Sequence, residues 1–155
     1  MQERAHLHAL MTEIGPALEL AEVEEFEREN LWVLTVGDGV VLFAEHQPYD
    51  GRLWLSTEVC EPPGERLALY ELILQYNARW KETGGVRLAL DGPEGSVVLA
   101  YDLPVAGLDL PRLQTVIRNF RDTLDGWRTI VAASGQTEGQ GSRGLDPMLM
   151  GMIRG

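Results

Sequence analysis

The chain has 155 residues, of which 45% are hydrophobic, and this length and composition fit one globular domain with a core of its own. Its formal net charge is −11, and the acidic excess lies in residues 1–65, which carry 14 acidic side chains and three arginines. This acidity argues against nucleic acids and anionic membranes as partners, no run approaches the roughly 20 apolar residues of a membrane span, and the single cysteine excludes an internal disulfide.

The chain opens with a pattern typical of a short amphipathic helix over residues 2–14. Four apolar side chains recur at spacings of three and four residues and share one face: Leu7, Leu10, Met11 and Ile14. Gly15 and Pro16 end this pattern. Residues 17–30 then contain six glutamates and few apolar residues, so we expect an acidic, solvent-exposed connector with only local structure.

Three strands are expected next, over residues 31–36, 40–46 and 52–59. The Gly-Asp-Gly sequence at 37–39 predicts a tight turn, and the third strand alternates apolar and polar side chains. The first two strands are apolar on both faces, unlike an antiparallel sheet with one face in water. We therefore expect the second face to be covered, either by the chain itself or by a partner.

A helix over residues 65–82 is expected to follow the break at Pro62-Pro63-Gly64. Its apolar residues form two stripes: Leu69, Ile73, Tyr76 and Trp80 in one, and Leu67, Tyr70 and Leu74 in the other. A helix that is apolar on nearly every side must be covered on more than one side. The chain's own sheet supplies one cover, and we predict that a second copy of the chain supplies the other, which makes the protein an obligate homodimer.

The last predicted elements are a hairpin, with strands over 86–90 and 96–102, and a long helix over 110–131. Asp109 is a suitable N-cap for this helix. The helix carries one apolar seam at alternating spacings of three and four: Leu110, Leu113, Ile117, Phe120, Leu124, Trp127 and Val131. A long amphipathic helix of this kind is expected to cross a sheet face.

Helices and strands do not alternate one for one in the order helix, three strands, helix, two strands, helix. This order predicts an α+β fold, with helices packed on a twisted, mostly antiparallel sheet, assembled as a homodimer. From residue 133 the composition turns to Gly, Ser, Gln and Thr, and then to a Met-rich end. We therefore predict one domain over residues 1–132 and a flexible tail over residues 133–155.

No group of residues in the sequence predicts catalysis. His6 and His8 lie two apart on a helix and face different directions, and His46 is an isolated histidine on a strand. Cys60 has no basic neighbour, and its flanking glutamates raise the pKa of the thiol, which predicts an unreactive side chain. Phosphate-binding, dinucleotide-binding and nucleophile-elbow motifs are absent. We expect neither enzymatic activity nor a cofactor or metal.

Several segments of patterned hydrophobic residues carry a family resemblance. They are Leu69–Asn77, Gly85–Asp91, Gly95–Leu99, Leu103-Pro104, Leu108-Asp109, Leu113, Phe120 and Trp127. Together with the order of the upstream elements, they resemble the class I chaperones of bacterial type III secretion, the family that includes the Tir chaperone. The likeness covers about residues 2–131 and rests on patterning rather than on chemical signatures.

The resemblance implies a cytoplasmic bacterial homodimer without ATPase activity. The implied dimer interface is built by the middle helix and a hairpin strand, through Leu69, Ile73, Tyr76, Trp80 and Leu88. It also implies that an N-proximal segment of a secreted effector wraps around the dimer in extended form, adds strands to free sheet edges and fills apolar patches. The residues expected to contact this segment are Leu7, Leu10, Met11, Leu34, Phe43 and Trp54.

Two other functions stay open from the sequence. Proteins of the same fold act as adaptors that sequester a secretion regulator, and small α+β domains also bind or convert metabolites. Stable co-purification with a secreted effector distinguishes a chaperone from such an adaptor. Retention of a metabolite without any protein partner favours the small-molecule alternative.

Overall fold

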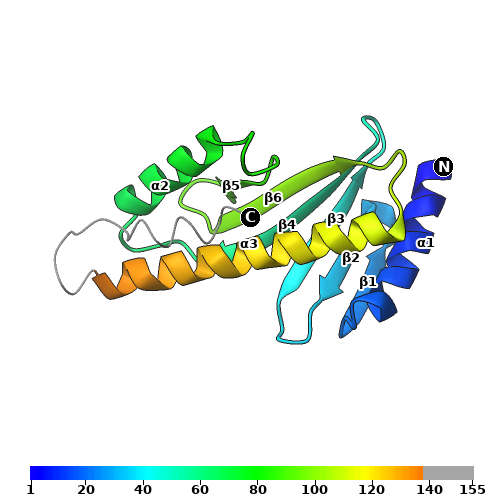
Figure 1. Cartoon of the computed structure of the whole chain (residues 1–155), viewed down its shortest axis with the longest axis horizontal. Coiled ribbons are helices and arrows are strands. Elements are labelled where there is room, and N and C mark those ends of the chain that lie inside the picture. The colour runs from blue at the N-terminus through cyan, green and yellow to red at the C-terminus, as the bar shows by residue number, and fades with distance from the viewer. Residues whose placement is uncertain (138–155) are drawn as a thin grey trace. The chain divides into compact units, whose positions relative to one another are not determined.

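The computed structural model describes residues 1–137, and side chains through residue 134 (Figure 1). Along these residues the elements, in chain order, are α1 (Gln2–Ala17), β1 (Glu22–Phe26), the 3₁₀ helix η1 (Glu27–Glu29), β2 (Leu31–Thr35), β3 (Val41–Gln47), β4 (Arg52–Cys60), α2 (Leu67–Ala78), β5 (Arg87–Leu90), β6 (Val97–Pro104) and α3 (Leu110–Thr137). None of these helices combines the length and apolar character that crossing a membrane requires.

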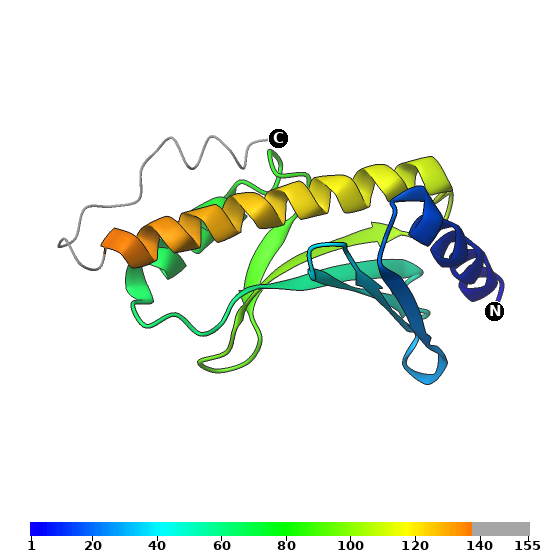
Figure 2. The same cartoon turned by 90° about the horizontal axis from the view of Figure 1, so that it is seen from below.

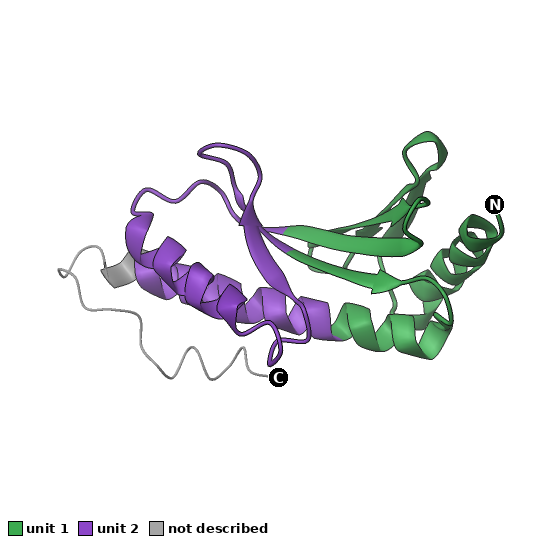
Figure 3. Ribbon diagram, turned by 90° about the horizontal axis from the view of Figure 1, so that it is seen from above, with its two compact units in different colours: residues 1–57, 100–118 green, residues 58–99, 119–155 purple. Residues whose placement is uncertain are grey.

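The strands form one sheet in the order β1-β2-β3-β4-β6-β5, with antiparallel pairing through β1–β4. This architecture confirms the predicted α+β class. The chain divides into two compact units (Figure 3). Unit 1 comprises residues 1–57 and 100–118, and unit 2 comprises residues 58–99 and the described residues from 119 onward. The boundary falls within β4, β6 and α3.

Unit 1 is built on α1 and strands β1–β4, and α1 runs alongside β1 (Figure 2). The apolar stripe of α1 is buried, as its helical spacing predicts. One face of the sheet, here called the inner face, is buried as well: Trp32, Leu34, Leu42, Ala44, Leu53 and Leu55. Alternate residues of β2, β3 and β4 therefore supply the sheet side of the core.

Polar contacts fasten α1 to the rest of unit 1. The Nε2 atom of His6 lies 2.6 Å from the carbonyl oxygen of Leu108. The guanidinium of Arg4 and the ring of His8 both contact the carboxylate of Glu25, at 2.7 Å and 2.6 Å. All three histidines of the chain take part in contacts of the first helix, since His46 also lies 3.4 Å from Glu3.

A strand occupies part of the segment that we predicted to be an acidic connector, residues 17–30. It is β1, which pairs antiparallel with β2, so four strands rather than three precede α2. Every second residue of β1 is partly buried and the others are exposed. The prediction was wrong because glutamates fill two of the three exposed positions, and pairing with β2 outweighs their low strand propensity.

Unit 2 contains α2, β5 and the C-terminal part of α3. The ring of Tyr76 packs edge-on against Trp127, with centroids 5.0 Å apart and planes at 88°, a favourable aromatic geometry. The Asn77 side chain donates to the carbonyl oxygen of Leu88 at 2.9 Å and accepts from the Leu88 N–H at 3.0 Å, which ties α2 to β5. One side of α2 is buried: Leu69, Leu72, Ile73 and Tyr76.

The long helix α3 begins at its predicted cap, where the N–H of Arg112 donates to Oδ1 of Asp109 at 2.9 Å. Its buried side chains end at Ile130, and Val131, the last residue of the predicted seam, is half-buried. The helix continues to Thr137, so the first residues of the predicted tail are helical. The rest of that tail, with its Met-rich end, lies outside the described residues.

Candidate partner-binding surfaces

The second face of the unit 1 sheet, here called the open face, carries exposed apolar side chains. It presents Phe26, Leu31, Val33, Val41, Phe43 and Trp54, from four strands. Phe26, Val41 and Phe43 are 39%, 36% and 40% exposed. The sequence predicts a second apolar face, and no segment among the described residues covers these three side chains. Contiguous exposed apolar surface of this kind marks an interaction site.

Strand register places these side chains in adjacent rows across the sheet. The first row is Phe26, Leu31, Glu45 and Trp54, and the second row is Glu24, Val33, Phe43 and Ser56. Directly opposed side chains on neighbouring strands have Cβ atoms roughly 5 Å apart. The apolar residues therefore form one continuous patch, with glutamates in and beside it.

Two of the predicted partner contacts, Phe43 and Trp54, lie on the open face. The other four are core residues, with exposures of 0–6%: Leu7, Leu10, Met11 and Leu34. This part of the prediction is corrected by the structure. Spacing on a helix or strand identifies the side to be buried, but not whether the chain or a partner buries it.

The open face also holds residues that sequence reasoning left out, namely Phe26, Leu31, Val33 and Val41. A signal for three of them existed, because the strands over 31–36 and 40–46 are apolar on both faces. Phe26 had no such signal, since it lies within the acidic segment in which we predicted no strand.

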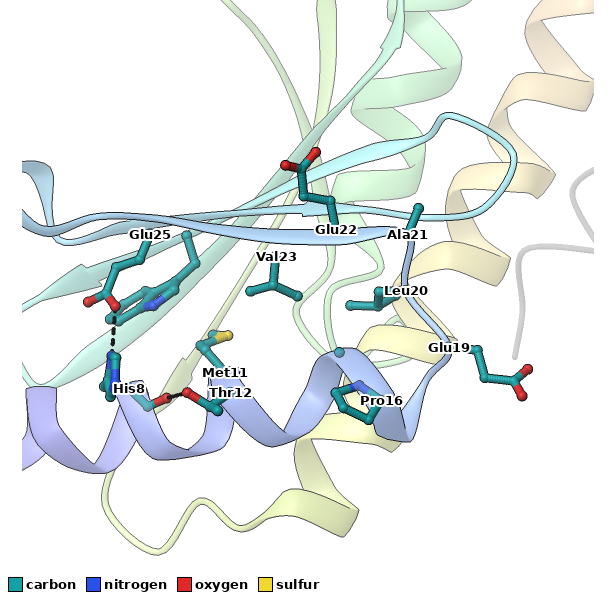
Figure 4. Close-up of a pocket in the computed structure, with 12 residues that line it drawn as sticks. His8, Met11, Thr12, Pro16, Glu19, Leu20, Ala21, Glu22, Val23 and Glu25 are labelled. Atoms are coloured by element: carbon teal, nitrogen blue, oxygen red, sulfur yellow. Dashed lines mark hydrogen bonds and ion pairs between the residues drawn. The ribbon is translucent and has the colours of Figure 1, made fainter.

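A hollow of about 670 Å³ lies between α1 and β1 (Figure 4). Its lining includes His8, Met11, Thr12, Gly15, Pro16, Glu19, Leu20, Ala21, Glu22, Val23, Glu25 and Trp32. Figure 4 shows Val23 pointing toward α1 and Glu22 pointing away from it. Gly15 lets the helix approach the strand closely, since a Cβ atom there would lie 3.3 Å from Cγ2 of Val23. The hollow is within the usual size range of ligand pockets.

The carboxylates of β1 differ in their surroundings. Glu25 faces α1, is 18% exposed at its side chain, and is paired with Arg4 and His8. Glu22 and Glu24 are exposed, and within the described residues no cationic side chain contacts either. The strand therefore presents two uncompensated negative charges at the border of the open face.

A smaller hollow of about 270 Å³ lies on β3 and β4. It is lined by Glu45, Gln47, Tyr49, Trp54 and Ser56. Tyr49 is 85% exposed. An aromatic ring beside a carboxylate, as here, can bind a partner's side chain whose stem is apolar.

In unit 2 the outward side of α2 and its surroundings are also apolar. Leu67, Leu74 and Trp80 are 81%, 69% and 60% exposed, and Leu90 on β5 is 41% exposed. We call these four residues the α2 stripe. Leu67 and Leu74 are seven residues apart and so lie on the same side of α2, and two such exposed leucines again indicate a surface that another molecule covers.

Four of the five residues predicted for the dimer interface are buried within unit 2 itself. Leu69, Ile73, Tyr76 and Leu88 have exposures of 2–7%, and only Trp80 is exposed. The sequence shows two apolar stripes on α2 without distinguishing them. Packing of Tyr76 on Trp127 assigns the first stripe to the core, so the exposed stripe is the one that contains Leu67 and Leu74.

The remaining titratable groups singled out from the sequence lie in packed surroundings. His46 is buried, with Nε2 3.4 Å from Oε2 of Glu3. Burial is the main reason that the pKa of the Cys60 thiol is raised. The negative charge of Glu58 raises this pKa by a smaller amount. Within residues 1–137 no group of three or more His, Cys, Asp and Glu side chains is arranged to hold a metal ion.

Comparison with known proteins identifies a family. The model of the Tir chaperone protein (CesT) family matches residues 9–128, a range that includes the open face, α2 and most of α3. No curated protein matches the sequence at a significant level.

Solved structures share the fold. The ExsC–ExsE complex superposes with a TM-score of 0.70 at 19% identity, covering 82% of this chain and 94% of that one. The HopA1–SchA chaperone–effector complex gives 0.69 at 18% identity, covering 83% and 98%. The Yersinia pestis type III secretion chaperone SycH, in complex with a stable fragment of YscM2, gives 0.57 at 22% identity, covering 75% and 94%.

Proposed function

Because this chain belongs to the Tir chaperone protein (CesT) family, we propose that it is a type III secretion chaperone that holds a segment of a secreted effector in extended form. It works in the bacterial cytoplasm as a homodimer, and it acts by binding rather than by catalysis. The bound segment stays soluble and competent for export, because the chaperone covers apolar side chains that would otherwise meet those of other chains.

The open face of unit 1 is the observation that carries this proposal. An extended segment points alternate side chains to one side, and the rows that contain Phe43 and Trp54 offer apolar surface to such side chains. Aromatic residues in a desolvated contact are often the ones that dominate binding energy. The hollow beside Trp54 gives a further position into which one client side chain can insert.

The structural relatives support the same partner class. One is a chaperone–effector complex, and another is a type III secretion chaperone bound to a fragment of a second protein. Both superpose on most of this chain. We infer that the common fold serves the same kind of partner here.

We assign the homodimer contact to the α2 stripe of unit 2. In a two-fold dimer the same patch of the two copies forms both sides of the contact. Each exposed side chain of the stripe is therefore buried in both copies. Burial of apolar surface stabilises by roughly 25 cal/mol per Å², and Leu67 and Leu74 are among the most exposed apolar side chains of the described chain. Trp80, just beyond the C-terminal end of α2, is exposed as well.

Affinity purification of the full chain from its native host, with identification of the co-eluting protein, tests the function. We expect one secreted protein at fixed stoichiometry, bound through its N-proximal segment, and we expect its export to fall when the chaperone is deleted. A co-eluting regulator that is not exported would replace this function with that of an adaptor. Retention of a metabolite, with no protein partner, would contradict it.

A further inference from the structure

The strand β1 has one edge that no other strand of the described residues occupies, because it is the first strand of the sheet order. Two backbone hydrogen bonds of 2.8 Å fix the pairing next to it: the N–H of His46 donates to Asn30, and the N–H of Val36 donates to Val40. In an antiparallel pair the bonding residues alternate along the strand. Even-numbered residues of β2 therefore bond to β3, and odd-numbered residues bond to β1.

This alternation identifies the backbone groups at the free edge of β1. Residues 31, 33 and 35 of β2 lie opposite residues 26, 24 and 22 of β1, so those three β1 residues bond to β2. The residues between them, Val23 and Glu25, direct their N–H and C=O groups to the other side. The free edge is thus able to exchange hydrogen bonds with one more extended segment at these two residues.

A segment added at this edge would continue both faces of the sheet. Its residue opposite Val23 would point to the side of the sheet where the hollow between α1 and β1 lies. Trp32 is part of the lining of this hollow, and so is Met11 (Figure 4). Its residues opposite Glu22 and Glu24 would point to the open side. These two positions are non-hydrogen-bonded pairs, the kind in which opposed Cα atoms are closest, at about 4.5 Å.

Charge determines which side chains fit opposite Glu22 and Glu24. Opposite charges directly across a pair of strands stabilise the pairing, and like charges destabilise it. Glu25 is paired with the guanidinium of Arg4, whereas the two exposed glutamates contact no cationic side chain among the described residues. The surrounding part of the chain adds to the effect, since residues 1–65 hold 14 acidic side chains and three arginines.

We propose that the free edge of β1 binds an extended client segment with Lys or Arg opposite Glu22 and Glu24 and an apolar residue opposite Val23. This inference rests on the proposed function, because it specifies the chemistry of the client segment. Backbone pairing alone accepts almost any sequence, so the two glutamates supply selectivity. They also oppose self-association, since pairing of two β1 edges centred on Glu24 would place glutamate opposite glutamate.

Three synthetic peptides test the edge directly by fluorescence anisotropy. The first has nine residues that alternate lysine and valine, the second has glutamate in place of lysine, and the third is the first with N-methylated valines. We expect the first to bind, and to weaken as salt is added. We expect the second and third to bind at least about tenfold more weakly, because one meets like charge and the other lacks the N–H donors that pair with β1. Equal binding of either control peptide, or no binding of the first, overturns the inference.

A matched pair of double variants locates the binding. Glu22→Gln with Glu24→Gln is expected to weaken the lysine–valine peptide about threefold to tenfold, the range for two exposed cross-strand ion pairs. Glu27→Gln with Glu29→Gln removes the same charge from η1, beyond the strand, and should change binding less than about twofold. Equal losses in the two variants would mean that the peptide responds to overall charge, and would overturn the inference.

The client identified by co-purification separates this inference from the function on which it rests. If the wild-type chain binds its client and the variant Glu22→Gln with Glu24→Gln binds it equally well, the edge preference is wrong and the chaperone function stands. If the wild-type chain has no protein client but still selects the lysine–valine peptide, the chaperone function is wrong and the edge preference stands.

Discussion

Unit 1 and unit 2 each leave large apolar side chains exposed, but they do so on different kinds of backbone. The open face of unit 1 lies on a sheet whose outer strand, β1, has free N–H and C=O groups and two uncompensated glutamates. The two most exposed residues of the α2 stripe, Leu67 and Leu74, lie on a helix, whose backbone groups are bonded internally along its length. Exposure alone therefore does not identify a partner. The backbone beneath the exposed side chains favours an extended client for unit 1 and side-chain packing with a second copy for unit 2.

The largest effect is expected at the α2 stripe. Leu74→Asp places a charge in an apolar contact, at a cost of several kcal/mol, and should weaken dimerisation at least about a hundredfold. Light scattering measures the mass, and circular dichroism should show a folded chain, because Leu74 is 69% exposed in a single copy. Gln75→Asp, on the same helix, is the control and should stay dimeric. A dimeric Leu74→Asp variant would move the contact to another surface.

Neighbouring residues of β2 distinguish the two faces of unit 1. Leu34→Ala should lower the free energy of unfolding by about 2–5 kcal/mol, because Leu34 is fully buried on the inner face. Val33→Ala, on the half-buried open face, should cost less than about 1 kcal/mol. Denaturant unfolding of the two variants gives the comparison. Similar costs would show that the open face is already covered in the free protein.

Client affinity should depend on unit 1 more than on unit 2. Phe43→Ser should weaken the binding of the co-purified client about tenfold or more, as expected for an aromatic at the centre of a contact. Leu90→Ser, in unit 2, removes an apolar side chain of nearly equal exposure, 41% against 40%, and should change affinity less than about twofold. Isothermal titration calorimetry at concentrations where both variants are dimeric tests this. The opposite ranking would assign the client to unit 2.

The smallest effect concerns Cys60, in unit 2. Because burial raises the pKa of the Cys60 thiol above its ordinary value, the thiolate fraction at pH 8 is lower in the folded chain than in the unfolded one. Alkylation by iodoacetamide should therefore be slower before unfolding than after it. The unfolded chain loses the thiol proton at a lower pH than the folded chain does. The free energy of unfolding should therefore fall slightly as pH rises through about 9. Equal alkylation rates would show that burial does not protect the thiol.

Periodicity predicts most of the order of elements, and it fails where the surroundings decide the outcome. The seam of α3 and the cap at Asp109 follow from spacing and local chemistry, both of which the sequence contains. The strand β1 does not, because it depends on pairing with β2 and on the ion pair between Arg4 and Glu25. The choice between the two stripes of α2 likewise depends on Trp127, about 50 residues further along the chain.

The contacts of the first helix show the same limit. Leu7, Leu10 and Met11 form an apolar stripe, and a stripe is compatible with either a core or a partner site. In the structure these three side chains are buried in the core. The apolar side chains that are exposed lie instead on the open face, on strands such as β3. Two-sided apolar strands are therefore the better sequence signal for a binding surface in this chain.

Hydrogen–deuterium exchange of the full chain, with and without its client segment, tests the central claim most directly. On client binding we expect slower exchange in β1, at Val23 and Glu25, whose N–H groups face the free edge, and little change in α2. Dilution of the free protein below its dimerisation constant should instead speed exchange in α2 and leave β1 unchanged. Client-dependent protection confined to α2, with β1 unaffected, would contradict the assignment of the client to unit 1 and of the second copy to unit 2.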